Sequence, residues 1–202
     1  MLLNARSIFN KNKNLKKLLT EISPDLTIIS ETFERQSKTL SAALNSKYFR
    51  RISYYRKNRS PGGGCAIIYN ENRFLVSDLQ IPAPAEIENC WALLLPKQQD
   101  TNKMKVKRIA VGSYYVSPRS KHKQDTLDHI IDTIQVLRAK FNNDINFIIG
   151  GDFNRLNVSD ILDSYGALKQ IISIPTRKTA TLEILLTDLH TMYHPPTTIP
   201  PL

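Results

Sequence analysis

The stretch Asn146-Phe147-Ile148-Ile149-Gly150-Gly151-Asp152-Phe153-Asn154 is the strongest indication of fold in this chain. A short apolar run that ends in turn residues is typical of a buried strand, and glycine permits turns that other residues make only at a cost. Asp152 and Asn154 are two positions apart, so they point the same way in an extended chain. Because ligands collect at strand ends in α/β proteins, this is a candidate site. An ordinary turn rich in Asp and Asn is the alternative.

A second stretch, from Pro24 to Glu31, has the same design. Each of the two apolar strands follows a segment with the spacing of an amphipathic helix, residues 15–22 in one case and 126–140 in the other. Each strand ends in a carboxylate, Glu31 or Asp152. This weak internal repeat suggests two related halves, each of which delivers one acid at a strand end.

The remaining pattern predicts an α/β fold in one domain, residues 1–202. Apolar strands alternate with helices, but pairs of strands joined by short turns, such as the pair on either side of Gly62-Gly63-Gly64, interrupt the alternation. That mixture indicates mixed β-sheets with helices on their outer faces. The proline-rich residues 191–202 should form a tail without regular structure.

Composition favours a nucleic-acid partner. The chain of 202 residues has 28 Lys and Arg against 18 Asp and Glu, a formal charge of +10, and a basic surface binds polyanions. A generically basic protein is the alternative. No apolar run approaches the length that spans a bilayer, so we expect no membrane partner. Cys65 and Cys90 are too few for a disulfide framework, which fits an intracellular, reducing compartment.

Several polar side chains come where predicted strands end, and they suit a metal-dependent hydrolase. These are Asn4, Glu31, Tyr115, Asp152 and Asn154, with Glu183 inside the last strand. Carboxylate and amide oxygens are ligands that Mg²⁺ prefers. A bound Mg²⁺ can stabilise charge on a reacting phosphodiester while a carboxylate activates water.

The ordered set of these segments resembles the endonuclease/exonuclease/phosphatase superfamily, and within it the endonuclease domain of non-LTR retrotransposons. The segments that carry the resemblance are Leu3-Asn4-Ala5-Arg6-Ser7-Ile8, Pro24-Asp25-Leu26 through Glu31-Thr32, Gly62-Gly63-Gly64, Tyr115-Val116-Ser117-Pro118, Gly151-Asp152-Phe153-Asn154, and Thr176-Arg177 with Leu182-Glu183-Ile184-Leu185. Together they cover nearly the whole chain.

The resemblance implies a four-layer α/β sandwich in which two mixed sheets are flanked by helices. It implies that Glu31, with Asn4 beside it, binds Mg²⁺ or Mn²⁺, and that Tyr115 contacts the scissile phosphate. Asp152 would orient or deprotonate the attacking water, and Asn154 would stabilise the transition state. The substrate would be DNA, nicked in the nucleus to prime a reverse transcriptase domain of a longer parent chain. We assign the nucleic-acid contacts to Arg6, Tyr55, Arg56, Arg59, Arg119, Thr176 and Arg177.

Two departures from the family pattern lead us to expect weakened activity. Glu183 stands where the family usually has Asp, as a catalytic residue that orients a histidine. The family's closing Ser-Asp-His motif is not reached before Leu202, so we expect an open sheet edge and a loss of two to four orders of magnitude in rate, roughly 3 to 5 kcal/mol. A non-catalytic nucleic-acid-binding remnant, or another phosphoesterase of the same superfamily, is the alternative.

Overall fold

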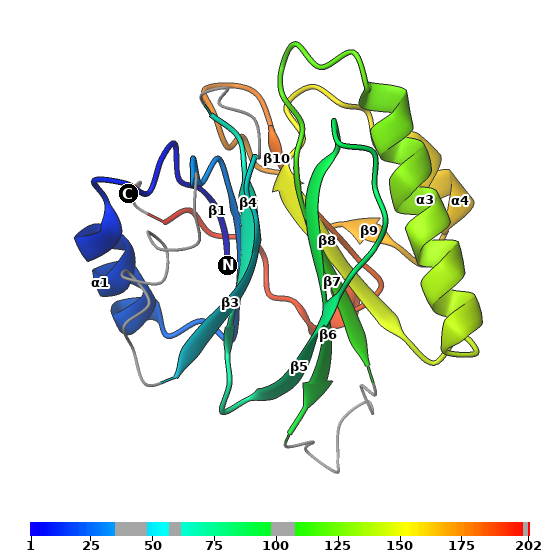
Figure 1. Ribbon diagram of the computed structural model, residues 1–202, viewed down its shortest axis with the longest axis horizontal. Helices are drawn as coiled ribbons and strands as arrows, with labels where there is room; N and C mark the ends of the chain where they lie inside the picture. The colour runs from blue at the N-terminus through cyan, green and yellow to red at the C-terminus, as the bar shows by residue number, and fades with distance from the viewer. Residues whose placement is uncertain (35–47, 57–61, 98–107, 200–201) are drawn as a thin grey trace.

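The computed structural model describes residues 1–34, 48–56, 62–97, 108–199 and 202. Two β-sheets face each other in this part of the chain (Figure 1). The first sheet has the order β1-β2-β4-β3 and consists of β1 (Leu2–Asn4), β2 (Leu26–Ser30), β4 (Cys65–Asn70) and β3 (Phe49–Tyr54). The second has the order β5-β6-β7-β8-β10-β9 and consists of β5 (Phe74–Leu79), β6 (Glu88–Pro96), β7 (Ile109–Tyr115), β8 (Asn146–Asp152), β10 (Glu183–Thr187) and β9 (Lys169–Gln170).

Helices cover the outer face of each sheet, which gives four layers (Figure 1). Helix α1 (Asn12–Ile22) packs on the first sheet, and α3 (Lys123–Lys140) and α4 (Ser159–Ser164) pack on the second. Each sheet contains one parallel pair, β1 with β2 and β7 with β8, among antiparallel neighbours. The predicted four-layer α/β sandwich with two mixed sheets is therefore confirmed.

Three apolar clusters hold these layers together. One joins α1 to the first sheet, one lies between the two sheets, and one joins α3 and α4 to the second sheet. The stripe of α3 that the sequence predicted supplies Leu127, Ile130, Ile134 and Leu137, all buried. Burying one such side chain contributes about 1.5 to 3 kcal/mol. The three clusters thus fix the helices against their sheets and the two sheets against each other, which sets the positions of the strand ends.

The predicted repeat is present as two β-helix-β units. In one unit β1, α1 and β2 follow each other, and in the other β7, α3 and β8 do so. Within each unit the two parallel strands end side by side, with Asn4 opposite Ser30 and Tyr115 opposite Asp152. Asn4, Tyr115 and Asp152 are therefore the last residues of β1, β7 and β8, and Glu31 directly follows the last residue of β2.

The last part of the chain packs against the first sheet. A 3₁₀ turn (His190–Met192) follows β10 and includes the first two residues of the proline-rich segment 191–202, and residues 193–199 form neither helix nor strand. Ile199 and Leu202 contact the apolar cluster of α1 and β1, where β1 forms the edge of its sheet. In the described ranges no helix is both long and apolar enough to cross a membrane.

Candidate active site

One row of polar side chains crosses four neighbouring strands of the second sheet. Pairing places Glu88 opposite Tyr115, Tyr115 opposite Asp152, and Asp152 opposite Glu183. Residues that face each other in a ladder project to the same side, and neighbouring strands lie about 4.8 Å apart. The row therefore presents three carboxyl groups and a phenol side by side at one end of the sandwich.

The first sheet brings two more polar residues to this row. The amide Nδ2 of Asn4 donates a hydrogen bond of 2.6 Å to Oδ2 of Asp152, which links the carboxyl ends of β1 and β8. Glu31 directly follows β2 and has φ +52°, a left-handed conformation that side chains other than glycine adopt at a cost. Its carbonyl accepts the N–H of Ser7 at 2.8 Å, which anchors the turn. The two predicted acids, Glu31 and Asp152, thus come from opposite sheets to one place.

The end of β8 depends on glycine. Gly151 has φ +149°, and a Cβ atom there would lie 1.8 Å from the carbonyl oxygen of Tyr114. Beyond it, Asn154 donates its backbone N–H to Asp152 Oδ1 at 2.9 Å and its side-chain Nδ2 to the carbonyl of Val116 at 2.7 Å. The Asn154 N–H and the Asn4 amide thus hold the two oxygens of the Asp152 carboxylate, and the bond to Val116 holds the Asn154 side chain.

Burial gives Asp152 an unusual acidity. Its side chain is fully buried, and desolvation raises its pKa from 3.8 to about 7. The negative charges of Glu183 and Glu31 raise this pKa further, while the hydrogen bonds from Asn154 and Asn4 oppose the change. A carboxyl group with a pKa near neutrality can exchange a proton with water at physiological pH.

Tyr115 remains protonated over the same pH range. Burial raises the pKa of its phenol to about 12, and the charges of Glu31, Asp152 and Glu88 add to that effect. The hydroxyl is therefore a hydrogen-bond donor at neutral pH, as a contact to a phosphate oxygen requires.

Glu183 is the first residue of β10 and pairs with Asp152, and Thr176 holds its backbone. The hydroxyl oxygen of Thr176 accepts the backbone N–H groups of Leu182 and Glu183, at 2.9 and 3.2 Å. Atom Oε2 of Glu183 is buried and has no hydrogen-bond partner among the described residues. Leaving a buried acceptor unsatisfied costs about 1 to 3 kcal/mol, so this oxygen is available to a ligand.

The oxygen atoms at this end of the sandwich suit a small divalent cation. The Glu31 carboxylate accepts no hydrogen bond from any described residue, and Oδ1 of Asn4 accepts only the N–H of Arg6, at 3.1 Å. Mg²⁺ typically uses one or two carboxylates, with water and phosphate completing its shell. No three acidic, His or Cys side chains of the described residues are grouped as a larger metal site would need. Glu31 with Asn4 is thus the set that fits.

Glu88 is the member of the row that sequence reasoning missed. It accepts hydrogen bonds from the Arg56 guanidinium and, at 2.6 Å, from the backbone N–H of Gly64. A Cβ atom on Gly63 would lie 2.3 Å from the Glu88 carboxylate, so the glycine turn makes room for this ion pair. An acid just before an apolar run, at the start of β6, was the only signal in the sequence.

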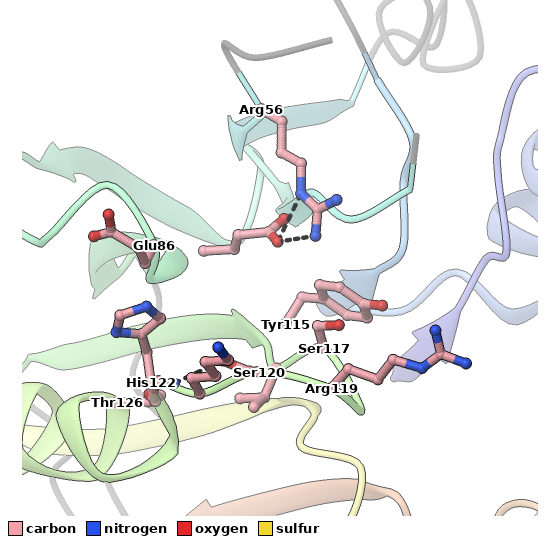
Figure 2. A pocket seen from close by; sticks show the side chains of 11 residues that line it. Arg56, Glu86, Tyr115, Ser117, Arg119, Ser120, His122 and Thr126 are labelled. Carbon is pink, nitrogen blue, oxygen red and sulfur yellow. Dashed lines mark hydrogen bonds and ion pairs between the residues drawn. The ribbon is translucent and has the colours of Figure 1, made fainter. Parts of the chain in front are cut away.

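The predicted nucleic-acid contacts divide into two flanks around the row. Asn4, Arg6, Thr176 and Glu183 line a hollow of about 490 Å³ on one flank. On the other flank, Arg56 and Arg119 line a pocket of about 310 Å³ that includes Tyr115 (Figure 2). Arg119, Arg177 and Tyr55 are exposed, whereas the Arg56 guanidinium is held by Glu88. Arg59 lies outside the described residues.

The four histidines are absent from the row of acids. His129 bonds to the Tyr114 hydroxyl on the helical side of the second sheet, and His190 lies beyond the opposite end of β10. His122 lines the 310 Å³ pocket and pairs with Asp125 at 2.8 Å. The sequence alone indicates only a surface or structural role for His122, so its place in the pocket emerges from the structure.

Several solved structures share this architecture. The human Nocturnin catalytic domain with bound sulfate superposes with a TM-score of 0.65 at 15% identity, over 90% of this chain and 76% of that one. ANGEL2, a 2′,3′-cyclic phosphatase, has a TM-score of 0.61 at 15% identity, over 86% and 72%. The Neisseria 3′ phosphatase NExo bound to a product DNA hairpin has 0.61 at 14% identity, over 92% and 84%.

Sequence comparison gives the family independently of these superpositions. No curated protein sequence matches the chain. A family model, described as the endonuclease/exonuclease/phosphatase family, matches residues 1–182. These residues include the whole row from Glu88 to Asp152 and end one position before Glu183. The chain therefore belongs to the endonuclease/exonuclease/phosphatase family, whose members are hydrolytic phosphoesterases.

Proposed function

We propose that this chain is a divalent-metal-dependent phosphodiesterase that nicks DNA, of the kind found in non-LTR retrotransposons. The observation that carries the proposal is the 2.6 Å hydrogen bond from Asn4 to Asp152. It joins the two sheets at the point where Glu31, Tyr115 and Asp152 gather. One site then contains a carboxylate to bind the metal (Glu31), a carboxylate to activate water (Asp152) and a phenol to contact the phosphate (Tyr115).

Asp152 is the general base of the proposed reaction. Its pKa of about 7 lets the ionised carboxylate accept a proton from the attacking water at neutral pH. The hydrogen bonds from Asn4 and from the Asn154 backbone fix both carboxylate oxygens. The base is thus oriented before substrate binds, which lowers the entropic cost of reaching the transition state.

The other residues bind the phosphate and its charge. Tyr115 donates a hydrogen bond to a phosphate oxygen, because its phenol stays protonated well above neutral pH. Asn154 has one amide hydrogen left after it donates to Val116, and this hydrogen serves the developing negative charge. Mg²⁺ or Mn²⁺ held by Glu31 and Asn4 would neutralise charge on the reacting phosphodiester.

DNA is the substrate class that the surface favours. The chain has a formal charge of +10, and the exposed Arg6, Arg119 and Arg177 lie on the loops that border the site. The similar fold of NExo, which was solved with a product DNA hairpin, supports a nucleic-acid substrate. In a nuclear parent chain with a reverse transcriptase domain, the nick would supply the primer end.

A supercoiled-plasmid nicking assay tests this function. With Mg²⁺ or Mn²⁺ the plasmid should become an open circle, and chelator should stop the reaction. Glu31→Gln and Asp152→Asn should each lower the rate at least about 100-fold, because each removes a charge from the reacting centre. Asp163→Asn, an exposed change on α4, is the matched control and should keep the rate.

Other outcomes would assign a different function. DNA binding without nicking, unaffected by Glu31→Gln, would make the chain a non-catalytic nucleic-acid-binding remnant. Release of inorganic phosphate from a phosphomonoester, with the plasmid left intact, would make it another phosphoesterase of the family.

A further inference from the structure

The pocket of about 310 Å³ shares Glu88 and Tyr115 with the row of acids, whereas Asp152 does not line it (Figure 2). Its walls are the end of the first sheet at Arg56, the start of β6, and the loop of residues 117–122 that leads into α3. Glu88 and Tyr115 face each other on adjacent strands, about 5 Å apart. Glu88, in the wall of the pocket, is thus about one strand spacing from Tyr115, which contacts the reacting phosphate in the proposed function.

The pocket has an acidic wall and a basic wall. Glu86 and Glu88 belong to one wall, and Arg119 and Lys121 belong to the loop on the other. Arg56 already neutralises Glu88, which also accepts a hydrogen bond from the Gly64 N–H. Glu86, by contrast, forms no ion pair or hydrogen bond with the residues that the structure describes. The Glu86 carboxylate is therefore available to accept hydrogen bonds from a ligand in the pocket.

This polarity selects the chemistry of the ligand. A phosphate group beside Glu86 would meet a like charge, whereas a group with N–H donors would bond to it. His122 is held through Nδ1 by Asp125 at 2.8 Å, which leaves its Nε2 for a second contact. The loop cations suit a phosphate at the other end of the same ligand. A nucleotide unit has this arrangement, and the volume lies at the lower end of small-molecule sites.

We propose that the pocket binds one nucleoside of the substrate strand next to the cleaved phosphate, and that Glu86 favours bases with an exocyclic amino group. The proposal rests on the nucleic-acid substrate of the proposed function. Cytosine, adenine and guanine offer amino hydrogens to a carboxylate. Uracil and thymine flank their only N–H with two carbonyl oxygens, which the carboxylate repels.

Equilibrium binding tests the pocket without any need for cleavage. Fluorescein-labelled pentadeoxycytidylate and pentadeoxyuridylate differ mainly in the group that Glu86 would read, and their affinities can be compared by anisotropy in chelator. The wild-type chain should bind the cytosine pentamer at least about fivefold more tightly, the lower end for one good base contact. In Glu86→Gln, whose neutral amide both donates and accepts, the ratio should fall to within about twofold.

A matched variant and the opposite results complete the test. Asp163→Asn removes one exposed carboxylate from α4 and should keep the wild-type ratio. Equal affinities in the wild type, or a ratio that Glu86→Gln leaves unchanged, would contradict base selection by Glu86. Neither result would contradict the proposed nicking activity. If neither pentamer binds while the plasmid is still nicked, the pocket is refuted and the nucleic-acid substrate stands; if neither binds and the plasmid also stays intact with Mg²⁺, both are refuted.

Discussion

At the residue scale, ionising the buried carboxyl of Asp152 costs free energy, and the same cost makes its carboxylate a better base. Its pKa rises from 3.8 to about 7 on folding, so the native state binds more protons than the unfolded state between these values. Stability contributed by the neutral form is therefore lost as the pH rises through about 7. A difference of one in pKa between the two states corresponds to about 1.4 kcal/mol of stability. A base that is costly to ionise is also one that accepts a proton readily.

Asp152→Asn should stabilise the fold at pH 8, because it removes the buried charge. The amide loses one of the two accepted hydrogen bonds, so we expect a net gain of about 1 to 2 kcal/mol, or a Tm higher by roughly 2 to 6 °C. The gain should shrink at pH 5, where Asp152 is already neutral. Thermal unfolding at both pH values measures it, with Asp163→Asn as control. A lower Tm at pH 8 would contradict the burial cost.

Gly151 and Gly166 offer a second matched comparison. A Cβ on Gly151 would overlap the Tyr114 carbonyl at 1.8 Å, whereas one on Gly166 would meet nothing within 4 Å. Gly151→Ala should therefore cost more than about 3 kcal/mol, and Gly166→Ala should stay within about 1 kcal/mol of the parent. Urea unfolding compares the two. Similar costs would show that the end of β8 can relax, and with it the position of Asp152.

At the element scale, the sequence predicted the strands that carry the two acids but not how they meet. The apolar runs before Glu31 and Asp152, and the helices that precede them, are strong periodic signals. Strand β5 was missed, because this edge strand mixes Ser and Asp with its apolar residues and half of it is exposed. The alternation of apolar strands and helices thus predicts the central elements of the two sheets, but it does not predict a short edge strand such as β5.

Pairing between distant strands explains what the sequence could not predict at the site. Glu88 faces Tyr115 only because β6 and β7 pair in one register, and a slip of one residue would turn it to the other face. The sequence suggests that Arg56 is a free phosphate-binding cation, yet its partner Glu88 is 32 positions away. Local patterns identify chemical groups, and tertiary pairing decides which of them are left for a ligand.

The packing of α3 on β7 contains a pH-sensitive contact. The indole N–H of Trp91 donates to the Tyr114 hydroxyl at 3.0 Å, and this hydroxyl donates to Nδ1 of His129 at 2.9 Å. When His129 is neutral, Nδ1 accepts this bond and Nε2–H donates to the carbonyl of Pro82 at 3.1 Å. Burial lowers the pKa of His129, although the Pro82 carbonyl and the charge of Asp132 partly oppose this effect.

His129 should therefore make the fold less stable in acid. The unfolded state takes up the proton first, so the free energy of unfolding should decline as the pH falls through the ordinary His value of 6.5. His129→Gln keeps a hydrogen-bond acceptor but does not titrate, so it should flatten this decline. Urea unfolding between pH 7.5 and 5 is the measurement. An identical slope in both proteins would exclude the contact as its source.

At the scale of the whole molecule, the formal charge of +10 predicts salt-sensitive DNA binding. Each phosphate contact contributes about 0.9 to the slope of log affinity against log salt. Arg119→Ala should lower that slope by about 1 and weaken binding to all sequences alike. Lys140→Ala, at the far end of α3, should leave it unchanged. Anisotropy measures both slopes. Equal effects of the two variants would show that the loop beside the site does not contact the DNA.

Above all, we expect Glu31 from one sheet and Asp152 from the other to share one cation-dependent site. Carbon-detected NMR titration of the Asp152 carboxyl, with and without Mg²⁺, measures this sharing directly. The pKa should be about 7 without the cation and should fall by about one or more when Mg²⁺ is present, because a nearby positive charge favours the ionised form. In Glu31→Gln the cation should have little effect. An ordinary pKa near 4, or a raised pKa that Mg²⁺ does not move, would exclude a cation shared by these two acids.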